Sequence, residues 1–89
     1  MLGVHLIVSG LVQGVGFRYF VYQKATAYHL TGFVRNLYSG EVEIIAIGER
    51  GMLEMLIADI KIGSRSAIVR DMRVAWIDQP DSFAGFEIR

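Results

Sequence analysis

Hydrophobic residues follow two different periods in the first third of the chain. GVHLIVSGLV is rich in Val, Ile and Leu that alternate imperfectly with other residues, which predicts a buried strand over Val4–Val12. From Phe17 onward, apolar residues recur every three or four positions, which predicts an amphipathic helix over Phe17–Tyr28. His29 follows, and histidine is one of the few non-glycine residues enriched in the left-handed conformation that closes a helix. The chain therefore opens with a strand, a tight turn and a helix.

The remaining residues predict a hairpin with its turn at Ser39-Gly40, a second helix, a long strand and a short closing strand. These elements lie at Phe33–Tyr38, Glu41–Ile47, Met52–Ile62, Val69–Ile77 and the final GFEIR. Trp76 alternates with small or polar neighbours in the long strand, so we expect it in the core.

The element order is β-α-β-β-α-β with an extra terminal strand, which predicts an α+β fold. The expected architecture is a two-layer sandwich of ferredoxin-like topology, with both helices on one face of a four- or five-stranded sheet that contains antiparallel pairs. No linker, repeat or low-complexity tract interrupts the pattern, so we expect residues 1–89 to be a single domain.

Composition excludes several classes of protein. Apolar residues make up 53% of the chain and charged residues 20%, which predicts a packed core rather than disorder. No apolar run approaches the roughly 20 residues that span a bilayer, and no signal-peptide pattern is present. The chain has no cysteine, and His5 and His29 stand far apart. We therefore expect a cytoplasmic monomer with no metal site and no membrane-spanning segment.

Charge is unevenly distributed although the net charge is zero. Residues 1–40 contain Arg18, Lys24 and Arg35 and no Asp or Glu. A local positive field kept clear of carboxylates suits an anionic ligand, although an uneven solvated surface would give the same pattern. The balanced total argues against nucleic acid as a partner.

The turn between the first strand and the first helix has the composition of an anion site. Gly14 and Gly16 allow positive φ and let backbone N–H groups face a ligand, and the helix that begins at Phe17 adds unpaired donors. Gln13 adds an amide. Arg18 stands in the first turn, where a cation opposes the helix dipole by roughly 0.3–1 kcal/mol. A residue that costs local stability here suggests ligand binding, but a glycine-rich turn with a surface arginine is an equal alternative.

Three known loops do not match this turn. A nucleotide-binding Walker loop that starts at Gly10 would need its second glycine at Val15, and a dinucleotide loop would need a third glycine at Tyr19. A phosphatase loop with a cysteine nucleophile would need that cysteine at Val12. The turn can hold phosphate, but it carries no nucleophile.

Two segments resemble the signatures of a known family. GLVQGVGFR, residues 10–18, and GFVRNLYSGEVE, residues 32–43, are similar to those of the acylphosphatases, and the similarity continues through AIG at 46–48 to the closing FAGFEIR. The resemblance implies a ferredoxin-like sandwich. It also implies hydrolysis of the carboxyl–phosphate bond of acyl phosphates to a carboxylate and inorganic phosphate, without metal or cofactor.

The resemblance also implies roles for particular residues. Arg18 matches the phosphate-binding arginine, and Asn36 matches the asparagine that orients the attacking water. The backbone cradle for the phosphate corresponds to Gln13, Gly14, Val15, Gly16 and Phe17. The chain departs from the family pattern at Leu11, His29, Tyr38-Ser39 and the GSRSAIV loop.

Residue chemistry supports the role of Asn36 independently. Asn36 interrupts an apolar strand two residues after Val34, and a buried amide needs hydrogen-bond partners that a water molecule can supply. Residues 1–40 contain no Asp or Glu that could act as a general base, and the acids of residues 43–49 suggest a solvated hairpin face. The alternative is a non-catalytic ferredoxin-like module that binds an anion, RNA or a regulatory ligand.

Overall fold

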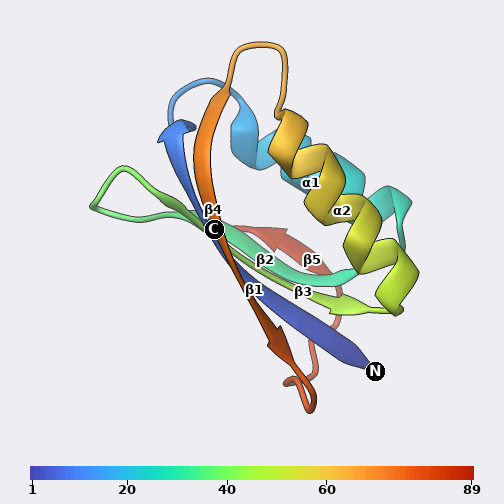
Figure 1. The fold of residues 1–89 in the computed structure, drawn as a ribbon. Coiled ribbons are helices and arrows are strands. Elements are labelled where there is room, and N and C mark those ends of the chain that lie inside the picture. The colour runs from blue at the N-terminus through green and yellow to red at the C-terminus, as the bar shows by residue number, and fades with distance from the viewer.

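The computed structural model describes residues 1–89, which form two helices and five strands. In chain order these are β1 (Leu2–Leu11), α1 (Phe17–Ala27), β2 (Thr31–Asn36), β3 (Val42–Gly48), α2 (Arg50–Ile62), β4 (Ile68–Ile77) and β5 (Phe86–Ile88). The strands form one sheet in the order β4-β1-β3-β2-β5, in which β5 runs parallel to β2 and all other pairs are antiparallel. Both helices cover the same face of the sheet (Figure 1). The predicted ferredoxin-like α+β class is confirmed.

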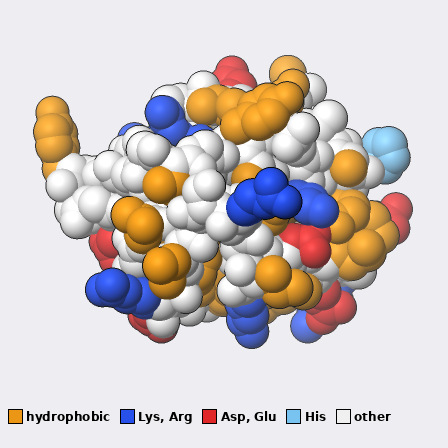
Figure 2. Space-filling model, turned by 90° about the horizontal axis from the view of Figure 1, so that it is seen from above, with side chains coloured by type: hydrophobic (Ala, Val, Ile, Leu, Met, Phe, Trp, Pro, Cys, Tyr) orange, Lys and Arg blue, Asp and Glu red, His pale blue; other side chains and the backbone are white.

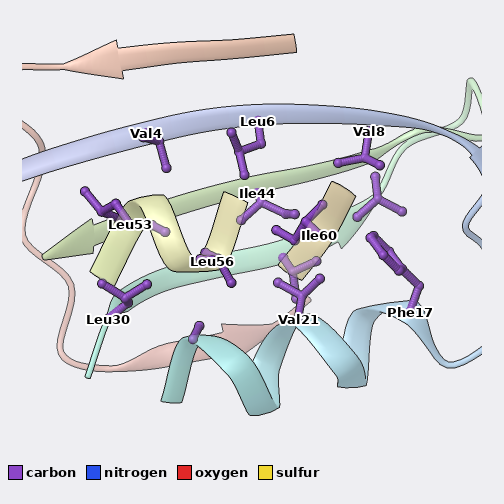
Figure 3. Packing of buried hydrophobic residues seen from close by; sticks show 14 of the residues in the cluster. Val4, Leu6, Val8, Phe17, Val21, Leu30, Ile44, Leu53, Leu56 and Ile60 are labelled. Carbon is purple, nitrogen blue, oxygen red and sulfur yellow. The ribbon is translucent and has the colours of Figure 1, made fainter. Parts of the chain in front are cut away.

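The core lies between the sheet and the two helices (Figure 3). Alternate residues of β1 point toward the helices because successive side chains of a strand face opposite sides, and Val4, Leu6 and Val8 are fully buried. The helices contribute Phe17, Val21, Ala25, Leu53, Leu56 and Ile60 to the same cluster. Full burial of one such aliphatic side chain contributes roughly 1.5–3 kcal/mol, so this cluster fixes where α1 lies on the sheet.

Helix α1 is bounded at both ends by residues with a left-handed backbone. Gly16, with φ of 77°, precedes its first residue. His29, with φ of 58°, follows its last turn, and the N–H of Leu30 bonds to the carbonyl of Ala25. The predicted role of His29 in closing the helix is confirmed. Neither helix of the structure is long and apolar enough to cross a membrane.

Strand β2 ends earlier than the sequence pattern predicted. The expected strand ran to Tyr38, but β2 stops at Asn36, because the N–H of Leu37 already bonds across the turn to the carbonyl of Glu41. The N–H of Gly40 closes the turn by bonding back to Leu37. Asn36 is therefore the last residue of its strand and lies at one end of the sheet.

Trp76 is not a core residue, and that prediction was wrong. Its side chain is 39% exposed, because β4 is an edge strand of the sheet. The guanidinium of Arg50 lies over the indole ring, 4.8 Å from its centroid. Arg50 is also the first residue of α2, which begins two residues before the predicted Met52. The alternation of apolar and polar residues identified the strand correctly, but it could not show that β4 pairs with another strand on one side only.

Candidate active site

The turn between β1 and α1 directs backbone donors toward one end of the sheet. Gly14 and Gly16 have φ of 72° and 77°, in the left-handed region that favours glycine. A Cβ atom added at either position would meet no neighbouring atom within 4 Å, so the space in front of both glycines is open. The first N–H groups of a helix have no acceptor within the helix. The turn therefore presents donors and the positive end of a helix dipole to a ligand.

One pocket of about 190 Å³ joins this turn to the end of β2. It is lined by Val12, Gly14, Gly16, Phe17, Arg18, Tyr19, Asn36 and Ile88. A larger hollow of about 460 Å³ lies elsewhere, around the loop that precedes β5, and no Lys or Arg lines it. The smaller pocket is the one that brings glycine-turn donors together with a cation, and it is therefore the candidate site.

Arg18 enters this pocket from the first turn of α1. Its Nη1 donates a hydrogen bond of 2.8 Å to the main-chain oxygen of Arg89, which fixes the guanidinium beside β5. Arg18 forms no ion pair with any Asp or Glu. Its charge is thus available to an anionic ligand, and its planar fork suits two phosphate oxygens.

Asn36 enters the same pocket from the end of β2. Its Oδ1 atom is buried and has no hydrogen-bond partner in the protein. Val34, two residues earlier on the same face of the strand, is fully buried. A buried acceptor without a partner costs about 1–3 kcal/mol. Such an atom beside a cation and a glycine turn indicates a site for a ligand or a substrate water.

A family model for acylphosphatases matches residues 4–88. The chain belongs to the acylphosphatase family. It is 45% identical over 85 residues to an acylphosphatase of Caldanaerobacter subterraneus subsp. tengcongensis, covering 96% of this chain and 94% of that one. It is 47% identical over 85 residues to an acylphosphatase of Chlorobaculum tepidum, with coverage of 96% and 92%. The crystal structure of the acylphosphatase from Bacillus subtilis superposes with a TM-score of 0.97 at 39% identity, covering 100% and 99% of the two chains.

The acylphosphatase resemblance found in the two signature segments is therefore confirmed over nearly the whole chain. The fold expected from that resemblance is confirmed as well. The expected enzyme class, an acyl phosphate hydrolase, follows from the same family match and from relatives that span the full length.

Four of the six residues expected to form the acylphosphatase phosphate cradle line the pocket, and the other two, Gln13 and Val15, do not. The side chain of Gln13 turns toward the β2–β3 hairpin. Its Nε2 donates to the carbonyl oxygens of Leu37 and Glu41, each at 2.8 Å. The amide expected among the loop donors therefore ties the glycine turn to the strand end that carries Asn36.

The C-terminal segment is the part of the acylphosphatase site that the sequence did not indicate. Ile88 lines the pocket, and the main chain of Arg89 holds Arg18. Both reach the site because β5 pairs in parallel with β2, with Ile88 opposite Val34. The closing FAGFEIR was part of the family resemblance, but hydrophobic period alone does not reveal which strand a short segment pairs with.

No Asp, Glu or His lines the acylphosphatase pocket. Glu43 of β3 faces the other side of the sheet, because its neighbours Val42 and Ile44 are buried under the helices. The solvated face expected for the hairpin acids is wrong for Glu43, whose side chain is only 15% exposed. It lies 2.7 Å from Nε2 of His5 and accepts a 2.5 Å hydrogen bond from Nε of Arg35.

The environment of Glu43 acts on its ionisation in two opposing ways. Burial on its own raises the pKa of the Glu43 carboxyl. The hydrogen bonds from His5 and Arg35, together with the charge of Arg35, outweigh burial and hold the pKa below its ordinary value. Glu43 therefore serves as a fixed anion in the far face of the sheet and not as a base in the pocket.

Proposed function

We propose that the protein cleaves the carboxyl–phosphate anhydride of acyl phosphates by in-line attack of a water molecule. In this proposal Arg18 and the backbone of residues 13–18 hold the phosphate, and Asn36 orients the water. The observation that carries the proposal is one pocket in which the glycine turn, an arginine without an acidic partner and an unpartnered buried amide oxygen meet.

Phosphate binding follows from the chemistry of the turn. N–H groups at a helix N-terminus and at residues with left-handed φ point together at a concave site, which suits the peripheral oxygens of a phosphoryl group. Arg18 adds a full positive charge at that site. A loose phosphoryl transition state spreads negative charge over the same three oxygens, so these donors stabilise it without covalent chemistry.

Asn36 supplies the second half of the mechanism. Its Oδ1 accepts a hydrogen bond from a water molecule, and this turns a lone pair of the water oxygen toward phosphorus. A new oxygen–phosphorus bond forms as the bond between phosphorus and the acyl oxygen breaks, and the carboxylate leaves with its electron pair. A carboxylate is a good leaving group and needs no acid. The proton of the water passes to a phosphoryl oxygen, in keeping with a pocket that no Asp, Glu or His lines.

Turnover of benzoyl phosphate by the purified protein, followed by loss of its ultraviolet absorbance, tests this function. We expect hydrolysis that persists in EDTA and that inorganic phosphate inhibits competitively. Arg18→Gln lowers kcat/KM by about 10²-fold or more, because a charged donor to the transition state is lost. Arg70→Gln, which removes an exposed arginine of β4, is the matched control and keeps wild-type activity.

Other outcomes separate the two candidate classes. Phosphate binding without turnover would favour the non-catalytic binding module, and wild-type activity in Arg18→Gln would remove Arg18 from the mechanism. If EDTA abolished activity and Mg²⁺ restored it, the reaction would need a metal ion and the metal-free mechanism would be wrong. The single domain over residues 1–89, the cytoplasmic location, the monomeric state and the absence of a nucleic acid partner stay predictions.

A further inference from the structure

Three aromatic rings stand in a row beside the phosphate pocket. Tyr19 lines the pocket next to Arg18, and its side chain is 58% exposed. Its ring stacks on that of Tyr22, with centroids 6.2 Å apart and planes inclined by 21°. Tyr22 in turn packs against Phe86 of β5, at a centroid distance of 6.5 Å. The exposed ring of Tyr19 therefore has a fixed support behind it.

The pocket rim around Tyr19 is apolar. Ile88 also lines the pocket and is 43% exposed. Arg18 is the one charged residue in the lining, and phosphate occupies it in the proposed function. The guanidinium of Arg89, next to Ile88 in sequence, lies over the ring of Phe33 at 4.1 Å. Because Phe33 faces away from the helices, that charge is on the other side of the sheet.

A second cation on α1 is also engaged elsewhere. Lys24 lies over the ring of Phe20 and 3.9 Å from the carboxylate of Asp59 on α2. An acyl group that extends from a phosphate held at Arg18 toward this rim therefore meets an aromatic face and an aliphatic side chain. Within the pocket lining it finds no second positive charge with which a carboxylate on the acyl group could pair.

We propose that Tyr19, supported by Tyr22 and Phe86, determines which acyl group the site accepts, and that the preferred substrates carry aromatic or other flat, apolar acyl groups. The inference rests on the proposed hydrolysis of acyl phosphates and adds the substrate class. A flat acyl group can stack on the exposed ring of Tyr19, whereas an acetyl group is too small to cover it. Stacking of this kind changes affinity by about two- to tenfold beyond the area buried.

The benzoyl phosphate to acetyl phosphate ratio of kcat/KM, measured for wild type and variants, tests the proposal. Taking the ratio within each variant and comparing variants cancels the different intrinsic reactivity of the two compounds. Tyr19→Ala lowers the ratio by about fivefold, mainly through KM for benzoyl phosphate, and Tyr19→Phe keeps it. Ile62→Ala removes an 82% exposed aliphatic side chain of α2 and leaves the ratio unchanged.

Non-hydrolysable phosphonates separate this proposal from the proposed function. Benzoylphosphonate inhibits wild type more strongly than acetylphosphonate, and Tyr19→Ala reduces that difference. If wild type hydrolyses both substrates and Tyr19→Ala leaves both the kcat/KM ratio and the phosphonate ratio unchanged, the acyl-group proposal is overturned and the hydrolase stands. If wild type hydrolyses neither substrate, the proposed function itself fails.

Discussion

Asn36 and Arg18 approach one pocket from two elements, and their different chemistry predicts different kinetic signatures. The charge of Arg18 acts on the phosphate both when the substrate binds and in the transition state. The amide of Asn36 has no charge with which to hold a phosphate, and its buried oxygen needs a donor such as water. Its contribution therefore belongs to the chemical step rather than to binding.

Replacement of Asn36 by alanine tests this division of roles. Asn36→Ala lowers kcat for benzoyl phosphate by about 10²-fold, because the attacking water loses its orientation, while KM and the inhibition constant for inorganic phosphate stay close to wild type. Gln79→Ala removes an exposed amide from the loop before β5 and serves as the control. A near-wild-type kcat, or a phosphate affinity that falls with kcat, would contradict the water-orienting role.

Some residues of this pocket could be predicted from the sequence and others could not. Arg18 and the two glycines were found because their neighbours in sequence are also their neighbours in space. Asn36 was found through a buried amide in an apolar strand and through a family resemblance, although the strand ends at Asn36 instead of continuing past it. Ile88 was missed because only the parallel pairing of β5 with β2 brings it to the site. Contacts between residues that only strand pairing brings together leave no local pattern in the sequence.

At the scale of elements, the turn between β1 and α1 depends on a backbone that only glycine adopts readily. Gly16 caps α1 with φ of 77°, and left-handed φ costs a residue with a Cβ about 1–2 kcal/mol. Gly51 is the second residue of α2, and the space where its Cβ would lie is open. The two glycines therefore respond to the same substitution in opposite ways.

The change to alanine at these two glycines separates backbone strain from helix propensity. Gly16→Ala lowers the free energy of unfolding by about 1 kcal/mol, and its Cβ projects into the pocket, so that kcat/KM falls as well. Gly51→Ala raises the free energy of unfolding by about 0.5 kcal/mol, because the unfolded chain loses freedom, and leaves kcat/KM unchanged. Urea denaturation and benzoyl phosphate turnover measure both effects. Equal stability of the two variants would show that the turn does not require left-handed φ.

Period and turn chemistry predicted every element but not the ends of all of them. Helix α2 begins at Arg50, ahead of its first apolar residue, since the N–H of Leu53 already bonds to the carbonyl of Glu49. Hydrophobic spacing reports only the residues that face the core, so polar first turns escape it. Trp76 shows the same limit for strands, because alternation does not distinguish an edge strand from a central one.

At the scale of the whole molecule, the sheet has one face covered by α1 and α2 and one face without helices (Figure 1). The β2–β3 hairpin projects from the body at the left of Figures 1 and 2. On the side seen in Figure 2, basic and acidic side chains are interspersed. The pocket belongs to the end of the helix-covered layer, whereas the network of His5, Arg35 and Glu43 belongs to the open face. Changes to this network are therefore expected to alter stability and not the catalytic step.

The lowered pKa of Glu43 makes the stability of the protein depend on pH on the acidic side. The ordinary pKa of this carboxyl is 4.5, and the folded state lowers it through His5 and Arg35. In the unfolded chain the carboxyl therefore takes up a proton at a higher pH than it does in the folded protein. The stabilisation is fully present above pH 4.5 and is lost as the pH falls through the lower, folded-state value.

Urea unfolding of wild type and Glu43→Gln between pH 7 and pH 3 measures this contribution. The variant is less stable than wild type at pH 7, because it lacks the carboxylate that interacts with His5 and Arg35. The difference in the free energy of unfolding shrinks as the pH falls below 4.5, because protonation then removes the same negative charge from wild type. Glu54→Gln, on the exposed side of α2, is the matched control and follows the wild-type pH profile. Parallel profiles for wild type and Glu43→Gln would mean that the carboxylate gains nothing from its two partners. In either case benzoyl phosphate turnover at pH 7 stays near wild type, because the network and the pocket lie on opposite faces of the sheet.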